Sequence, residues 1–134
     1  MIEPKRIWVN GCFDILHEGH MELLKYAKSL GDTLIVGIDS DKRVKELKGP
    51  ERPINSAEER KKALLELDFV NSVVIFKSEG ELELYIDDLR IHCMVVGSDY
   101  KNKKVVGGQY AGSVKFFDKI EGYSTTKIIE QNGK

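Results

Sequence analysis

The chain has few of the residues that build crosslinked, metal-rich or membrane proteins. Its 134 residues include two cysteines, three histidines and three prolines. Cys12 and Cys93 fit free thiols in a reducing compartment better than a disulfide framework. No apolar run approaches the roughly 20 residues that cross a bilayer, and no signal-peptide pattern follows Met1. We therefore expect a cytoplasmic globular protein with no membrane partner.

A large excess of charge of one sign is also lacking. The formal net charge is −1, although 32% of the residues are charged and 41% are hydrophobic. A balanced surface has no general attraction for nucleic acid, so we expect none as a partner, and an anion must bind through a local cluster. The length predicts one domain over residues 1–134, and there are no internal repeats.

Two common nucleotide-binding motifs are absent. The sequence contains neither G-x-G-x-x-G nor G-x-x-x-x-G-K-[S/T]. These absences argue against dinucleotide-dependent oxidoreductases and P-loop NTPases.

What the chain does contain is an alternation of short apolar strands and helical segments. We expect strands at 6–10, 33–38, 73–76, 93–96 and 114–117. We expect helices at 18–30, 42–47, 58–67, 81–89 and from residue 124 to about 131, with a long polar segment over 97–112. This alternation predicts βαβ units, a parallel sheet and a ligand site beyond the carboxyl ends of the strands.

The run Asn-Gly-Cys-Phe-Asp-Ile-Leu-His-Glu-Gly-His, residues 10–20, joins the first expected strand to the first expected helix. A helix N-terminus offers unpaired N–H groups and the positive end of the helix dipole, which suit a phosphate. His17 and His20 can face one side of the first turn, and Gly19 leaves the backbone accessible. Two other interpretations stay open, a metal pair and ordinary surface histidines; His92 is the remaining histidine and lies in an apolar run.

The segment 11–20 resembles the G-x-F-D-x-x-H-x-G-H signature of the cytidylyltransferase-like nucleotidyltransferases. Glu-Gly-Tyr-Ser-Thr-Thr, residues 121–126, resembles the second signature of that family, so the similarity spans nearly the whole chain. The resemblance implies an α/β, Rossmann-like, doubly wound parallel sheet of five strands in the order 3-2-1-4-5, with helices on both faces. It also implies transfer of a nucleoside monophosphate to a sugar or polyol phosphate, with release of pyrophosphate.

The resemblance further implies which residues form the site. Catalytic roles are expected for His17, His20, Lys48 and Arg60. Nucleotide binding is expected for Cys12, Phe13, His17, Gly19, His20, Lys48, Lys119, Glu121, Gly122, Ser124, Thr125 and Thr126. Substrate contacts are expected for Asp14, Lys45 and Asp99. Mg²⁺ is expected on the triphosphate rather than in a protein cage.

Several of these residues have simpler interpretations when the pattern is considered without the family. Ser124 fits a helix cap, Lys48 a solvated lysine and Asp14 a turn cap. Arg60 could be an exposed side chain paired with Glu59. At position 119 this chain has lysine, whereas the glycerol-3-phosphate branch of the family tends to carry arginine. Lysine keeps the positive charge but lacks the forked guanidinium group.

Two acceptors compete within the family. The loops 48–55, 97–101 and 121–126 are most similar to the adenylyltransferase domain of ADP-heptose synthases, which uses ATP and a heptose 1-phosphate. The chain length also fits glycerol-3-phosphate cytidylyltransferase, which uses CTP. We favour the first. A nucleotide-binding module without turnover is a further alternative, and a homodimer is expected because the family commonly forms one.

Overall fold

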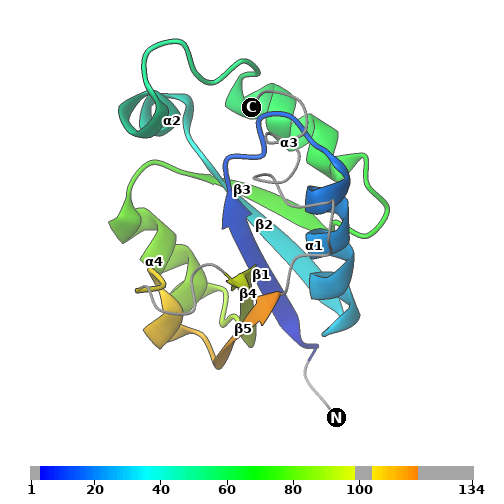
Figure 1. The fold of residues 1–134 in the computed structure, drawn as a ribbon. Helices are drawn as coiled ribbons and strands as arrows, with labels where there is room; N and C mark the ends of the chain where they lie inside the picture. The colour runs from blue at the N-terminus through cyan, green and yellow to red at the C-terminus, as the bar shows by residue number, and fades with distance from the viewer. Residues whose placement is uncertain (1–3, 99–103, 118–134) are drawn as a thin grey trace.

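The sheet contains five parallel strands in the order β3-β2-β1-β4-β5 (Figure 1). The computed structural model describes residues 4–98 and 104–117. Its strands are β1 Arg6–Gly11, β2 Thr33–Asp39, β3 Ser72–Phe76, β4 Cys93–Gly97 and β5 Ser113–Phe117. Its helices are α1 Glu18–Ser29, α2 Asp41–Lys48, α3 Ala57–Leu65 and α4 Glu79–Asp88, with a short 3-10 helix η2 at Gly108–Tyr110.

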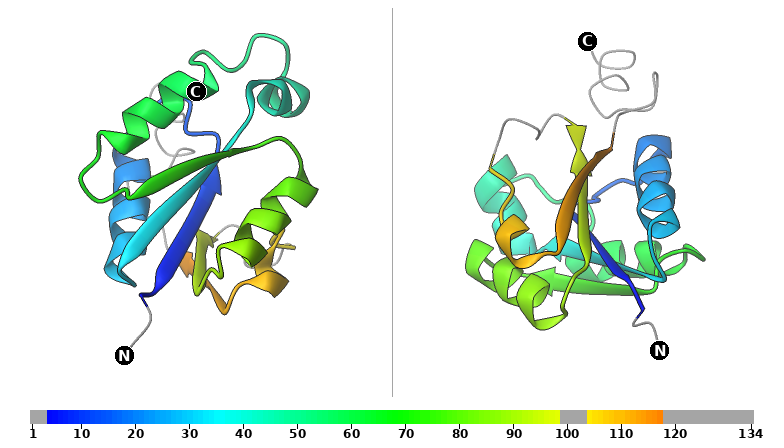
Figure 2. Two further views of the ribbon diagram at one scale, coloured as in Figure 1. Left: turned by 180° about the vertical axis from the view of Figure 1, so that it is seen from behind. Right: turned by 90° about the horizontal axis from the view of Figure 1, so that it is seen from below.

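Helices cover both faces of the sheet (Figure 2). An apolar layer lies on each face, between the sheet and these helices. On one face, Leu24 of α1 and Leu64 of α3 pack on inward side chains of β1 and β2. On the other face, Leu82 and Ile86 of α4 pack against Trp8. Strands covered on both sides need apolar residues at consecutive positions, which explains the runs at 7–9 and 34–36.

The Trp8 side chain of β1 packs directly on the neighbouring strand β2. Its side chain is fully buried and lies across Gly37 of β2. A Cβ atom at Gly37 would lie 2.3 Å from the nearest Trp8 ring atom, so only glycine leaves room for the ring. The indole Nε1–H donates to Asn10 Oδ1 over 3.0 Å at the end of the same strand.

The predicted fold class and strand order are confirmed, and the helix bounds need correction. Helix α4 begins at Glu79 rather than 81, because Ser78 is its N-cap and accepts from Glu81 N–H. Helix α3 ends at Leu65 rather than 67, and α2 extends from Asp41 to Lys48.

The expected polar segment 97–112 is partly wrong. Within its described residues, η2 forms, and Val105, Val106 and Ala111 pack against the Trp8 layer. In the described ranges, no helix has the length and apolar character needed to span a membrane.

Candidate active site

A crevice opens where the strand order reverses. β1 pairs with β2 from Arg6 to Gly11, but it pairs with β4 only through Ile7↔Cys93 and Trp8↔Met94. Beyond these pairs lies a hollow of about 110 Å³, lined by Val9, Asn10, Leu23, Val95, Val96, Gly97, Lys104 and Val105. Ligands of open parallel sheets bind at this switch point, so the crevice is where a substrate is expected.

The two histidines of the predicted phosphate site form the first turn of α1. His17 is the N-cap, and its Nδ1 accepts from Gly19 N–H at 3.0 Å and His20 N–H at 3.4 Å. His20 Nδ1 accepts in return from His17 N–H at 3.3 Å. The rings stack with centroids 3.7 Å apart. The pair therefore makes a capping box, with imidazoles in place of the usual serine and glutamate.

This arrangement determines the tautomer of both rings. Because each Nδ1 accepts a backbone N–H, the proton of each neutral ring is on Nε2. Burial lowers the pKa of His17. Burial, the nearby His17 ring and the Lys48 ammonium together lower the pKa of His20 to about 4, against a smaller opposing effect of the Ile15 backbone. Both rings are therefore neutral at pH 7.

Lys48 and Lys45 both belong to the last turn of α2. The positive charge of Lys48 contributes to the lowered pKa of His20. The helix ends at Gly49, which has a φ of 105° and so needs glycine. Both lysine side chains are exposed. Lys48 thus lies within electrostatic range of His20, and Lys45 lies one turn earlier on the same helix.

Asp14 holds the loop after α2 against the histidine turn. Its buried carboxylate accepts from the backbone N–H groups of Ile54 and Asn55, both at 2.8 Å, and from Arg52 Nε at 3.3 Å. Burial alone would raise the Asp14 pKa, but these donors together lower it. The carboxylate therefore holds this loop, and its expected contact with the acceptor stays a prediction.

Arg60 is buried, which corrects the alternative of an exposed side chain paired with Glu59. Its residue exposure is 1%. Its guanidinium donates to the carbonyls of Cys12, Asp39 and Asn55 and to the Asp41 carboxylate, over 2.8–3.1 Å. These partners come from the end of β1, the end of β2, the start of α2 and the loop before α3. Arg60 is therefore placed to hold these segments together, and its expected catalytic role stays a prediction.

The structure also identifies a scaffold residue that sequence reasoning missed. Asp41 Oδ1 accepts from Arg60 Nη2 at 2.9 Å and from Ala57 N–H at 2.8 Å, which joins the starts of α2 and α3. In the sequence, Asp41 looks like part of a helix cap, and no local signal indicates its partners 16 and 19 residues away.

Three further expected nucleotide-binding residues lie at the same turn. The Cys12 carbonyl is held by Arg60. Phe13 has a positive φ of 50°, and its buried ring meets the His20 ring edge-on at 5.0 Å. Gly19 donates its N–H to His17. The remaining expected residues lie outside the described ranges: Asp99, Lys119, Glu121, Gly122, Ser124, Thr125 and Thr126.

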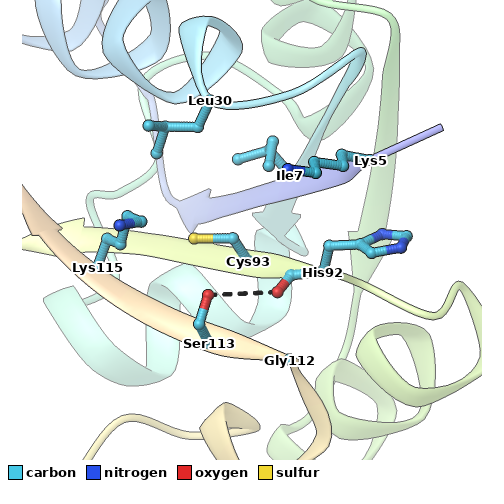
Figure 3. A pocket seen from close by; sticks show the side chains of 8 residues that line it. All are labelled: Lys5, Ile7, Leu30, His92, Cys93, Gly112, Ser113 and Lys115. Carbon is cyan, nitrogen blue, oxygen red and sulfur yellow. Dashed lines mark hydrogen bonds between the residues drawn. The ribbon is translucent and has the colours of Figure 1, made fainter. Parts of the chain in front are cut away.

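The third histidine lies elsewhere, which weighs against a histidine metal site. His92 lines a hollow of about 320 Å³ with Lys5, Cys93 and Lys115, at the amino ends of the strands (Figure 3). Its Nδ1 accepts from Arg6 N–H at 3.0 Å. Within residues 4–98 and 104–117, no three His, Cys, Asp or Glu side chains are grouped as metal ligands. The three histidines therefore do not share one site.

Comparison with known proteins identifies the family of this chain. A model of the cytidylyltransferase-like family matches residues 8–131. The chain belongs to the cytidylyltransferase-like family. As a member of this family, it is a nucleotidyltransferase.

Similar proteins cover nearly all of this cytidylyltransferase-like chain. Bifunctional protein HldE of Campylobacter fetus is 48% identical over 125 residues, which are 93% of this chain and 27% of the relative. The Helicobacter hepaticus protein of the same name is 48% identical over 128 residues, 96% of this chain and 26% of the relative. The chain thus spans about a quarter of the length of these curated relatives.

Solved structures share the fold. The lipopolysaccharide core biosynthesis protein of Thermoplasma volcanium has a TM-score of 0.69 and 26% identity, covering 88% of this chain and 98% of its own. A protein of unknown function from Archaeoglobus fulgidus has a TM-score of 0.62 and 21% identity, covering 90% and 93%. The second likeness supports the fold alone.

Proposed function

We propose that the chain transfers a nucleoside monophosphate from a nucleoside triphosphate to a sugar phosphate, with ATP and a heptose 1-phosphate as the favoured pair. The observation that carries the proposal is the pair of neutral, stacked imidazoles at the start of α1, with the Lys48 charge acting on His20. The similarity of the loops to the adenylyltransferase domain of ADP-heptose synthases supports the acceptor. So does the likeness to a lipopolysaccharide core biosynthesis protein.

In the proposed reaction, an oxygen of the acceptor phosphate attacks the α-phosphorus in line. A new P–O bond forms while the bond from the α-phosphorus to the α,β-bridging oxygen breaks, and pyrophosphate leaves with that oxygen. Because the attacking phosphate oxygen is already anionic at pH 7, no side chain has to remove a proton. Catalysis then consists of positioning and charge stabilisation.

Each site residue has a role in this proposal. The Nε2–H groups of His17 and His20 donate to oxygens of the α-phosphate and the bridging oxygen. Lys48, with Ser124 to Thr126, holds the departing pyrophosphate, and Lys45 and Asp99 contact the acceptor. Arg60 and Asp14 keep the two loops in place. Mg²⁺ enters with the nucleotide as part of the substrate, bound by phosphate oxygens and water, and neutralises phosphate charge.

A pyrophosphate-release assay tests the proposal. ATP and CTP are each combined with a heptose 1-phosphate and with glycerol 3-phosphate, in the presence of Mg²⁺. We expect release with ATP and the heptose phosphate. Release only with CTP and glycerol 3-phosphate would instead support the cytidylyltransferase branch. Tight nucleotide binding without release from any pair would support a binding module. The homodimer also stays a prediction from the family, and the cytoplasmic location stays a prediction from the sequence.

A further inference from the structure

Asn10 is a polar side chain at the crevice that the proposed mechanism does not use. It is the last residue but one of β1, and it lines the hollow between β1 and β4. It lies two residues after Trp8, which is the last β1 residue that pairs with β4. Its side chain is thus placed where the sheet opens, on the face that carries Trp8.

The hydrogen bond from Trp8 determines the orientation of the Asn10 side-chain amide. The indole Nε1–H can only donate, and it donates to Asn10 at 3.0 Å, so the bonded atom must be the amide oxygen Oδ1. The amide nitrogen Nδ2 then carries two N–H donors on the opposite side. Among the described residues, no acceptor is hydrogen-bonded to Nδ2.

The surroundings indicate what these donors would bind. Lys104 also lines the hollow and brings a positive charge, while Gly97 contributes no side chain. The remaining walls are the aliphatic residues Val9, Leu23, Val95, Val96 and Val105. A hollow of about 110 Å³ with N–H donors, a cation and apolar walls suits an oxygen-bearing group of negative charge.

We infer that the Asn10 amide donates to an anionic oxygen of a substrate in the crevice and contributes to substrate specificity. This inference rests on the proposed function, since it assigns one more contact to the same site. The oxygen belongs either to the nucleotide or to the acceptor phosphate, which share this chemistry. Trp8 acts behind Asn10 as a positioning residue that holds the amide in the donating orientation.

The substitution Asn10→Asp isolates the donors. Aspartate has nearly the same shape and still accepts from Trp8 Nε1–H, so the fold should be kept. It loses both N–H donors and places a negative charge toward the substrate. Asn71→Asp is the matched control, because Asn71 Oδ1 accepts from Leu34 N–H and Lys28 Nζ, which aspartate also does. Asn71 is exposed, and neither Asn71 nor its two partners line the crevice.

Direct binding by calorimetry with ATP, CTP, a heptose 1-phosphate and glycerol 3-phosphate gives a test that does not require turnover. We expect Asn10→Asp to weaken one class of ligand at least tenfold, with Asn71→Asp within twofold of wild type. Weaker nucleotide binding assigns the oxygen to the nucleotide, and weaker sugar-phosphate binding assigns it to the acceptor. Equal affinities for every ligand in the two variants, or binding of no ligand by wild type, overturn the inference.

Turnover separates this inference from the proposed function. Absence of pyrophosphate release by the wild-type protein contradicts the function, whereas the binding comparison still decides the role of Asn10. Where wild type turns over, we expect Asn10→Asp to raise KM for the affected substrate more than it lowers kcat. Thermal unfolding of both variants, with Tm values near that of wild type, excludes loss of fold as the cause.

Discussion

Replacing Arg60 tests whether the site depends on its scaffold or only on residues that reach the phosphates. Arg60→Met keeps an unbranched side chain of similar length and removes the guanidinium. The Cys12 and Asp39 carbonyls then lose their donors at the ends of β1 and β2. The Asp41 carboxylate loses its ionic partner as well. The substitution thus releases the strand ends from α3 without touching the histidines.

The expected cost follows from these contacts. A buried acceptor that loses its donor costs about 1–3 kcal/mol. Three carbonyls are affected, those of Cys12, Asp39 and Asn55, and each residue is only half-buried, so each loss should lie near the low end of this range. The Asp41 side chain is 45% exposed, so water can solvate it and the lost ion pair adds no more than about 1 kcal/mol. We expect a loss of about 3–5 kcal/mol, within the usual total stability of about 5–15 kcal/mol, so most molecules should stay folded in the cold.

Urea denaturation measures this stability, and pyrophosphate release per folded molecule measures the effect on the site. We expect kcat to fall about a hundredfold, because displacements near 1 Å have effects of this size. Leu64→Ala is the control. Leu64 is buried on the same helix and its loss costs a similar 2–5 kcal/mol or so, but it makes none of the Arg60 hydrogen bonds.

Comparing the activities of the two variants can contradict a positioning role for Arg60. If Arg60→Met and Leu64→Ala lower activity per folded molecule equally, Arg60 contributes stability alone. If Arg60→Met lowers the free energy of unfolding by less than about 1 kcal/mol, the expected cost of the lost hydrogen bonds is refuted. The stability and the activity of Arg60→Lys should lie between those of wild type and Arg60→Met. An ammonium group keeps the charge but cannot span acceptors on separate segments.

Four other outcomes are expected. His17→Asn should lower kcat on the order of a hundredfold in the pyrophosphate assay, as loss of a transition-state donor does. The free energy of unfolding should fall as pH drops from about 6.5 to about 4, because the unfolded chain binds a proton at His20 first; His20→Asn should flatten this slope in urea titrations. Lys48→Met should raise the His20 pKa in an NMR titration. Gly37→Ala should lower stability by about 1–3 kcal/mol, because its Cβ meets the Trp8 ring.

The parts of the fold that sequence predicted are those with local signals. The strands appear as apolar runs, and the glycine-containing turn with two histidines appears as one short motif. Lys48 is indicated as a site residue only by the family resemblance, and its electrostatic effect on His20 has no local signal in the sequence. The sequence predicts the start of helix α4 two residues too late. Gly80 in its first turn is a poor helix former, so the pattern does not indicate the N-cap at Ser78.

The scaffold of the site could not be predicted in the same way. Asp14 binds backbone groups 40 and 41 residues away, and Arg60 reaches a carbonyl 48 residues away. Backbone N–H and C=O groups are present at every position, so no residue pattern marks them as partners. The divergence of β1 and β4 after Trp8 is likewise a property of strand geometry, and it determines where Asn10 is placed.

The geometry also explains why imidazoles suit this turn. As the cap of α1, the His17 ring must accept at Nδ1, and to hold a phosphate it must donate at Nε2. A neutral imidazole does both at once, whereas an imidazolium donates at both nitrogens and gives up the cap. Lysine cannot accept, and a serine cap is too short to extend beyond the turn. Burial, which lowers the pKa of both histidines, therefore maintains the one protonation state in which the same side chain can start the helix and bind the substrate.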